Sequence, residues 1–180
     1  TQGRLLADMV DPYSYKDRYA LPKLIIRGSN DPYWPVDAMQ LYIHDLPGDT
    51  WLHIDPNAGH GLANYERVLT TLSGFYLHVV GVLALKPIHT GLRENGDSAM
   101  LTVKANALVA SMNLWRAHDA TTDFRHALWE CQSTGLGISR TFAIDRPPAG
   151  FTAVYGEIEY RVLGMDIVLD TPVYVIEPAR

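Results

Sequence analysis

The sequence predicts an α/β domain followed by an all-β antiparallel sandwich, because the spacing of its apolar residues changes part-way along the chain. In the first part, continuous apolar runs alternate with amphipathic stretches, as in parallel strands joined by helices. From Ser98 onward, short alternating segments rich in β-branched and aromatic residues are separated by Gly, Pro, Asn or Asp. We therefore expect an α/β domain in residues 1–86, a linker in residues 87–97 and a β-sandwich in residues 98–180.

The first part is expected to contain two parallel strands, each followed by a helix. Residues 23–29 (KLIIRGS) hold the continuous apolar run of a strand that is covered on both faces. Residues 35–46 (PVDAMQLYIHDL) follow as an amphipathic helix, with Pro35 suited to its first turn. Residues 51–55 (WLHID) predict the second strand and residues 65–83 the second helix. This order favours a right-handed parallel unit.

The second part is expected to form short antiparallel strands. Their alternation is clearest in TAVYGEIEYRVL, where Val154 and Ile158 share one face while Glu157 and Glu159 share the other. Gly164 is expected in the turn of the last hairpin. Two packed sheets are the natural outcome of this pattern. The predicted strand segments are LTVKA, SMNLWRA, FRHALWEC, RTFAID, TAVYGEIEYRVL and MDIVLDTPVYVI.

The composition limits the classes of partner. The chain has 180 residues, of which 47% are hydrophobic, and a formal net charge of −5, which is ordinary for a globular protein with a sizeable core. The absence of a run of Lys or Arg argues against binding to nucleic acid or to an anionic membrane. Residues 69–85 are too short and too polar for a membrane span. We expect a small-molecule or peptide substrate, or a protein partner.

His60 is the first candidate for a functional residue, because it lies between two glycines shortly after the second predicted strand. A side chain there can project into a cleft above the sheet edge. Asp31 holds the corresponding place after the first predicted strand, where a carboxylate can accept the Nδ1 proton of His60 and leave Nε2 free as a base. The order acid, then histidine, is that of α/β-hydrolases. Asp31 and His60 are therefore predicted as two members of a catalytic triad.

The neighbouring residues suggest further roles and simpler explanations. Tyr33 and Trp34 closely follow Asp31 and are candidates for substrate binding, although core packing explains many of the aromatic residues equally well. SNDP is also a turn sequence, in which Asp31 can bond to its own backbone, and His60 can be a loop histidine without a catalytic role. The histidines lack the spacing of metal ligands, so neither a metal site nor a cofactor is expected.

The nucleophile is missing from the predicted triad. No G-x-S-x-G motif occurs, and Cys131 lies alone among predicted strands, where a cysteine is usually a packing residue. An α/β-hydrolase places its nucleophile before the acid, so we expect the nucleophile upstream of Thr1 in a longer protein. The chain alone is then expected to be inactive. The unpaired edge of the first strand is expected to need that upstream half, or another copy of the chain, to cover it.

Long blocks of the sequence resemble a known family. They are VDPYSYKDR, LPKLIIRGSNDPYW and PNAGH, followed later by LWRAHDATTDFRHALW and PPAGFTAVYGEIEY. These blocks resemble the PhoPQ-activated pathogenicity-related protein family, whose members include secreted proliferation-repressing proteins. The resemblance implies the C-terminal part of an α/β-hydrolase-like parallel sheet followed by a β-sandwich, with Asp31 and His60 on the acid and base positions. It also implies a secreted or periplasmic location.

Three functions are compatible with these observations. In the first, the chain is the C-terminal portion of a serine-hydrolase-like protein that cleaves esters or peptides, and Asp31 orients His60 as general base and then general acid. In the second, the protein is a non-enzymatic secreted binding or signalling protein on a hydrolase scaffold. The third, a carbohydrate-binding module in the sandwich, requires an exposed aromatic row that includes Trp115 and Trp129.

Overall fold

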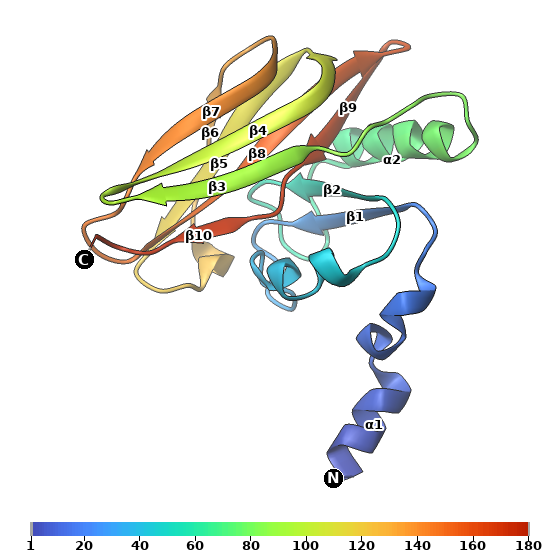
Figure 1. Cartoon of the computed structure of the whole chain (residues 1–180), viewed down its shortest axis with the longest axis horizontal. Helices are drawn as coiled ribbons and strands as arrows, with labels where there is room; N and C mark the ends of the chain where they lie inside the picture. Colours follow the sequence, from blue (N-terminus) through green and yellow to red (C-terminus); the bar gives the residue numbers. More distant parts are fainter. Residues whose placement is uncertain (1, 180) are drawn as a thin grey trace.

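The computed structural model describes residues 2–179, except for the side chains at positions 106 and 108. The chain is of mixed α/β type and is mostly strand (Figure 1). Its elements in chain order are α1 (Gln2–Val10), η1 (Pro12–Arg18), β1 (Lys23–Gly28), η2 (Ala38–Leu41), η3 (Ile43–Asp45), β2 (Thr50–Asp55), α2 (Tyr65–Val79), β3 (His89–Asn95), β4 (Ser98–Val109), β5 (Ser111–Asp119), η4 (Phe124–His126), β6 (Glu130–Ser133), β7 (Gly137–Asp145), β8 (Phe151–Val162), β9 (Met165–Asp170) and β10 (Tyr174–Ile176). The predicted fold class is confirmed at the level of a mixed α/β chain.

The strands lie in two sheets. The larger has the order β1-β2-β9-β8-β5-β6, with β10 paired to β8, and the smaller has the order β3-β4-β7. Strands β1 and β2 form at the predicted places and run parallel to each other. The other pairs are antiparallel, and β8 and β9 are joined by the predicted turn at Gly164, where φ is +75°.

The parallel pair is attached to the antiparallel strands through a narrow junction. Strand β2 meets β9 at one pair of residues, Leu52 and Asp170. The backbone N–H of Ile54 then donates to the Asp170 carboxyl at 2.6 Å, so this side chain takes the place of a further backbone partner. Beyond the junction, α2 runs along the edge of β9, and the backbone N–H of Val168 donates to the hydroxyl of Thr71 at 3.1 Å (Figure 1). The two predicted parts of the chain therefore share one sheet.

Apolar side chains pack on both faces of the larger sheet. Between the two sheets, residues of the smaller sheet such as Leu101 and Phe142 meet Leu114 and Ile158 of the larger one. On the opposite face a second cluster gathers around Tyr155, as the alternation of side chains along β8 requires. It consists of Val36, Met39, Leu52, Ile54, Ala117, Phe124, Ala127, Trp129, Ala153, Tyr155 and Val173. The segments after β1 and before β6 are thus packed together on this face.

Three local predictions differ from the structure. The helix predicted for residues 35–46 is wrong: the segment forms η2 and η3, because Tyr42 leaves helical geometry at φ −140°. The segment expected as a linker contains β3, which pairs with β4 from end to end. The strand expected in FRHALWEC begins later, at Glu130, because the Asp123 side chain accepts from the Arg125 N–H and closes the turn η4 instead.

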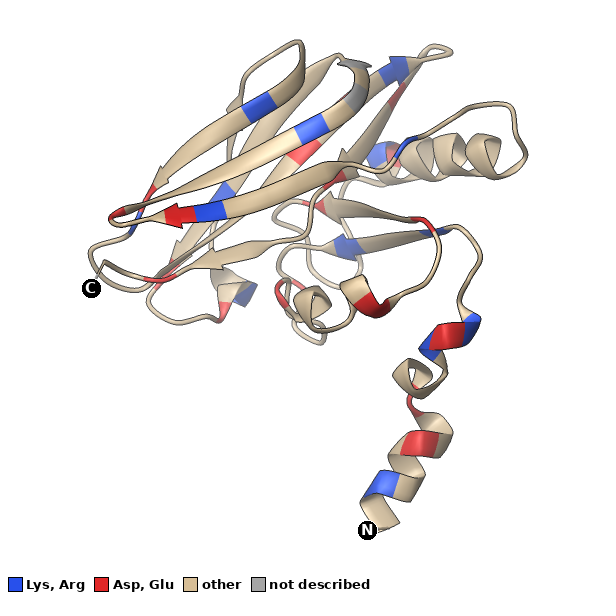
Figure 2. Cartoon of the chain, in the orientation of Figure 1, with Lys and Arg blue, Asp and Glu red and all other residues tan. Residues whose placement is uncertain are grey.

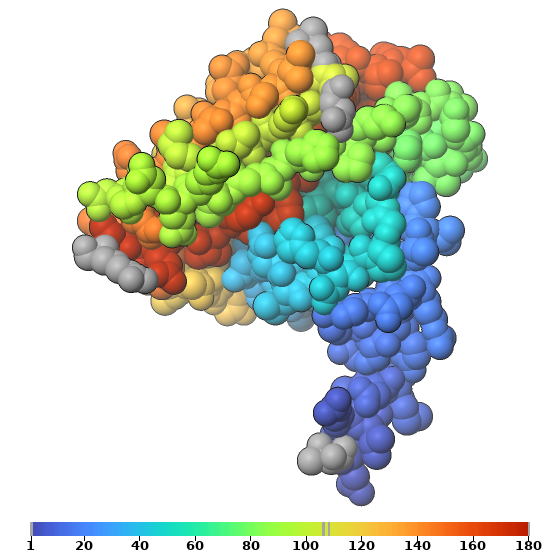
Figure 3. Space-filling view, in the orientation of Figure 1, coloured from blue at the N-terminus to red at the C-terminus, as the bar shows by residue number. Residues whose placement is uncertain are grey.

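The surface carries no large block of positive charge in view. Figure 2 shows Lys and Arg interspersed with Asp and Glu over both sheets and the N-terminal helices. Helix α1 has no buried residue and projects away from the rest of the molecule (Figure 3). No helix within residues 2–179 has the length and apolar character needed to cross a membrane.

A histidine and a carboxyl group lie buried at the β2–β9 junction. The imidazole of His53 is fully buried, and its Nδ1 lies 3.6 Å from Asp170 Oδ2. Burial and the nearby charge of Arg67 lower the pKa of His53 from 6.5 to about 4. Burial and the charge of Glu157 raise the pKa of Asp170 well above its ordinary value. At neutral pH His53 is therefore uncharged, and burial favours the neutral form of Asp170, which lowers the cost of burying the two groups.

We predict that His53 makes the protein less stable as the pH falls from 6.5 to about 4. In this range the unfolded chain binds a proton at His53 that the folded chain does not bind, so the free energy of unfolding decreases with falling pH. At pH 4 this decrease in the free energy of unfolding reaches about 3 kcal/mol. Urea unfolding at several pH values should show a loss of this size relative to His53→Leu. An equal pH dependence in both proteins would contradict the prediction.

Candidate functional site

The structure brings the predicted acid and histidine into contact. Asp31 and His60 lie on the loops that follow β1 and β2, and the carboxyl ends of these parallel strands meet at one edge of the sheet. His60 Nδ1 lies 2.9 Å from Asp31 Oδ2. The Asp31 side chain is 6% exposed, whereas the His60 side chain is 53% exposed. The pair therefore combines a buried carboxyl group with an imidazole that solvent and a ligand can reach.

Both oxygens of Asp31 are used. Oδ1 accepts the backbone N–H groups of Tyr33 at 2.8 Å and Trp34 at 3.1 Å, and Oδ2 faces His60. Burial by itself raises the pKa of Asp31, but the hydrogen bonds from His60 and from these two N–H groups outweigh it and lower the pKa below 3.8. An ionised carboxylate only accepts, so Nδ1 of His60 carries a proton, and in the neutral ring Nε2 is left with its lone pair. Asp31 thus closes the turn and faces His60 at the same time.

The two loops are held together by close backbone contacts. A Cβ at Gly28 would lie 2.2 Å from the carbonyl oxygen of Ala58, so this position requires glycine. The N–H of Asn30 donates to the same carbonyl at 2.9 Å. The N–H of Asn57 donates to the hydroxyl of Ser29 at 2.7 Å. These contacts fix the separation of the backbones that carry Asp31 and His60.

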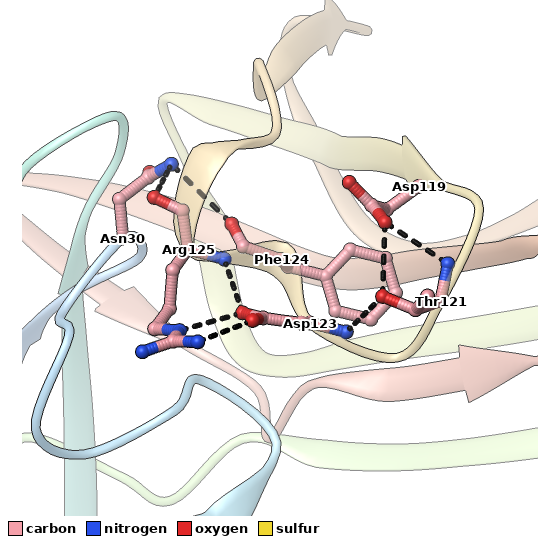
Figure 4. A network of polar contacts seen from close by, with 6 residues as sticks. All are labelled: Asn30, Asp119, Thr121, Asp123, Phe124 and Arg125. Carbon is pink, nitrogen blue, oxygen red and sulfur yellow. Dashed lines mark hydrogen bonds and ion pairs between the residues drawn. The ribbon is translucent and has the colours of Figure 1, made fainter.

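The segment before β6 anchors both loops from outside. The amide nitrogen of Asn30 donates to the carbonyl of Ala127 at 2.8 Å. It also faces the carbonyl groups of Phe124 and Arg125 at longer range (Figure 4). Arg125 is in turn held by Asp123 through its N–H and its guanidinium group.

The second loop has its own anchors. Asn57 exchanges two hydrogen bonds with the backbone of Trp129, at 2.8 and 3.0 Å. The buried carboxylate of Asp55 accepts the N–H groups of Ala63 at 2.6 Å and Asn64 at 2.9 Å, at the end of the loop. Both site loops therefore rest on fixed supports.

Tyr33 and Trp34 flank the imidazole. The ring of Trp34 is stacked on that of His60, with centroids 5.1 Å apart and planes 26° apart. The ring of Tyr33 meets His60 edge-on at 5.1 Å. Both aromatic side chains are exposed, so all four predicted site residues lie together at the surface. Trp34 also lines an adjoining pocket of about 570 Å³ whose other walls include Tyr13, Tyr19 and Tyr42.

Other predicted candidates do not join this site. Within residues 2–179, no Ser, Thr or Cys side chain is hydrogen-bonded to His60. Burial and the charge of Glu157 raise the pKa of the Cys131 thiol, which makes it a weak nucleophile. Trp129 is buried and Trp115 is half-buried against Tyr155, so they do not form the exposed row that a carbohydrate-binding surface requires. Residues 2–179, as far as the structure describes them, contain no group of three or more His, Cys, Asp or Glu side chains arranged to hold a metal ion.

Comparison with known proteins identifies the family. The profile described as PhoPQ-activated pathogenicity-related protein matches residues 1–125. The chain belongs to this family. The autocrine proliferation repressor protein A of Dictyostelium discoideum is 25% identical in an alignment of 181 residues that covers 86% of this chain and 36% of that protein. The chain thus spans about a third of the length of this relative, and no solved structure matches it.

The supporting residues of the site were not recognised in the sequence. Asn30, Asn57 and Gly28 neither bind a ligand nor carry charge, so residue type alone does not mark them. One signal was available: Asn57 adopts φ +59°, a conformation that asparagine tolerates better than most residues, in the sequence Pro-Asn. The backbone groups that bind the side-chain amides of Asn30 and Asn57 lie more than 70 positions away along the chain, which no local pattern indicates.

We predict that Gly28→Ala destabilises the protein by about 1–3 kcal/mol, because the added methyl group overlaps the carbonyl of Ala58. Gly59→Ala is the control in the neighbouring loop, since a Cβ there meets nothing within 4 Å. Its effect should stay below about 1 kcal/mol. Urea unfolding of the three proteins measures both effects, and equal stability of the two variants would contradict the account of Gly28.

Proposed function

We propose that the chain is the C-terminal portion of a serine-hydrolase-like protein, in which Asp31 and His60 are the acid and histidine of a catalytic triad. The observation that carries this proposal is the 2.9 Å contact between Asp31 Oδ2 and His60 Nδ1 on loops after neighbouring parallel strands. The proposal assigns residues 1–86 to part of an α/β-hydrolase-like domain and residues 98–180 to a β-sandwich domain. Its reaction is the hydrolysis of an ester or a peptide.

The chemistry follows from the orientation of the imidazole. Nε2 of His60 accepts the proton of a serine hydroxyl as the serine oxygen attacks the substrate carbonyl. The imidazolium that forms is stabilised by the carboxylate of Asp31, and it donates its proton to the departing alcohol or amine. Nε2 then accepts a proton from the water that cleaves the acyl-enzyme, and returns it to the serine. Asp31 remains ionised throughout, in agreement with its lowered pKa.

Tyr33 and Trp34 are proposed as substrate-binding residues. Their rings lie on two sides of the imidazole, so a group that approaches Nε2 passes close to them. The backbone N–H groups of Tyr33 and Trp34 both donate to Asp31, which fixes the backbone from which the two aromatic side chains extend. Exposed aromatic surface beside a base suits an acyl or side-chain group of the substrate.

An upstream part of the protein is proposed to supply the nucleophile and the oxyanion donors. Among the described strands, β1 stands at the end of the larger sheet, so its outer backbone groups can pair with a further strand. Helix α2 also exposes an apolar stripe along its length: Tyr65, Leu69, Leu72, Tyr76 and Val79. We propose that the upstream half covers these surfaces, and that the chain alone does not hydrolyse substrate.

A second function is favoured by the name of the relative. The Dictyostelium protein is described as an autocrine proliferation repressor, which is a signalling role. In a secreted binding or signalling protein, the bonds from Tyr33 and Trp34 to Asp31 would be structural, and His60 would only pack against them. A nucleophile whose reactivity depends on His60 is expected for the hydrolase and not for the signalling protein.

We predict that a fluorophosphonate probe labels the full-length protein and that His60→Ala reduces the labelling rate about 100-fold or more, because the general base is lost. His126→Ala is the matched control, since His126 is exposed and lies outside the site. Circular dichroism confirms folding of both variants. Absence of labelling in all three proteins, or equal labelling with and without His60, would contradict the hydrolase proposal and favour the signalling one.

A further inference from the structure

The pocket beside Trp34 is walled mainly by aromatic and aliphatic side chains. Tyr13 comes from η1 and Tyr19 from the residue that caps it, while Tyr42 lies between η2 and η3. Ile25 of β1 also lines the pocket. The volume of about 570 Å³ is in the range of small-molecule sites, which are typically lined by apolar and aromatic groups.

Polar contacts hold η1 against η3 and so fix the walls. The hydroxyl of Tyr13 donates to the carboxylate of Asp45. Lys16 Nζ lies 3.1 Å from the same carboxylate and 3.1 Å from the hydroxyl of Tyr13. The tyrosine, the lysine and the carboxylate thus connect two segments that lie about 30 positions apart along the chain.

The charged groups of the lining are engaged within the protein. They are Asp11, Lys16 and Lys23. Lys16 is paired with the carboxylate described above, Lys23 Nζ donates to the carbonyl of Pro47 at 2.5 Å, and the Asp11 carboxylate accepts the backbone N–H of Tyr13 at 3.0 Å. A charged ligand would compete with these contacts, whereas an apolar group leaves them intact. The lining therefore favours an apolar ligand.

The aromatic rings of the lining are accessible from solvent. Tyr13 and Tyr19 are each 41% exposed, and Trp34 is 59% exposed. An aromatic ring that enters the pocket covers this apolar surface and can contact the rings in stacked or edge-on geometry. Several rings around one pocket favour an aromatic group over a polar one of the same size.

The pocket lies on a face of β1, not along its edge. Lys23 and Ile25 both line it, and side chains two positions apart in a strand point to the same face. A further strand from the upstream half would pair with backbone groups at the outer edge of β1. Such pairing leaves the side chains on this face accessible.

We propose that this pocket binds an aromatic ring of the substrate, carried by a peptide side chain or by the acyl group of an ester. This inference rests on the proposed hydrolase function, to which Trp34 connects it. The indole lines the pocket and is also stacked on His60, with centroids 5.1 Å apart. His60 and Tyr33 do not line the pocket, so the indole stands between a ring bound there and the imidazole. Trp34 is thus a specificity-determining residue.

¹⁹F NMR of the chain labelled with 5-fluorotryptophan tests the proposal, with Trp34→Phe to assign the Trp34 signal. N-acetyl-phenylalanine amide and methyl 3-phenylpropanoate should each shift this signal with a Kd of about 1 mM or below. N-acetyl-alanine amide, which lacks the ring, should bind at least about tenfold more weakly. Tighter binding of the phenylalanine amide assigns the ring to a peptide, and tighter binding of the ester assigns it to an acyl group. Absence of a saturable shift, or equal affinity for the alanine derivative, would overturn the proposal.

Variants separate the pocket from general attraction to exposed aromatic surface. Tyr19→Ala removes one ring from the lining and should weaken binding of the phenylalanine amide about fivefold. Tyr76→Ala removes an exposed ring of α2 outside the pocket and should leave the Kd unchanged. Circular dichroism confirms folding of both variants. Equal affinities of the two variants would overturn the proposal.

The full-length protein shows whether the pocket stays open beside the upstream half. The phenylalanine amide should shift the Trp34 signal there with a Kd within about twofold of that of the chain. Loss of this binding would show that the upstream half fills the pocket, and would overturn the proposal. The titration needs no nucleophile, so binding without fluorophosphonate labelling would contradict the hydrolase reaction and leave the aromatic site standing.

Discussion

The junction between β2 and β9 determines where the rest of the molecule lies. The two strands meet at Leu52 and Asp170, and the Asp170 carboxyl binds the next backbone N–H, that of Ile54. Beyond this point the strands separate, and α2 occupies the edge of β9. A longer pairing of β2 with β9 would leave no place for α2 at that edge. Burial favours the uncharged forms of Asp170 and His53, which lowers the cost of burying this junction.

The same junction positions two polar clusters, one around Asp31 and His60 and the other around Glu157. It directs β1 and β2 so that their following loops pack against the segment before β6, where Asn30 and Asn57 find their backbone partners. Asp31 and His60 are then carried by loops with fixed ends. On the other side, α2 at the edge of β9 brings Arg67 to Glu157, and the bonds of Glu157 orient Asn113 and Trp115. One attachment point thus supports the proposed triad and the buried ion pair between Arg67 and Glu157.

Local patterns in the sequence predicted those features that depend on local physics. The apolar run of β1, the turn at Gly164 and the placement of Asp31 and His60 after neighbouring strands follow from periodicity, turn chemistry and chain order. Glu157 shows the limit of such reasoning. Alternation placed it on the polar face of β8, but it is buried because α2 covers that face with Arg67, 90 positions earlier in the chain.

Contacts between distant segments account for the remaining differences. The apolar face of residues 35–46 was recognised, and Met39 is buried, but the backbone forms short turns instead of a helix. Gly28 reads in the sequence only as the end of a strand, whereas its role is the close approach of the loop at Ala58. The pairing of β2 with β9 was equally hidden, because it joins residues 118 positions apart through a single pair.

The central claim is that Asp31 holds the imidazole of His60 with its proton on Nδ1 and a free lone pair on Nε2. Long-range proton–nitrogen NMR spectra of the ¹⁵N-labelled chain, at a pH where the ring is neutral, report the position of the proton directly. We expect His60 to be the Nδ1–H tautomer, and this preference to be lost in Asp31→Asn. An Nε2–H tautomer in the unmodified chain, or the same spectrum in both proteins, would contradict the account.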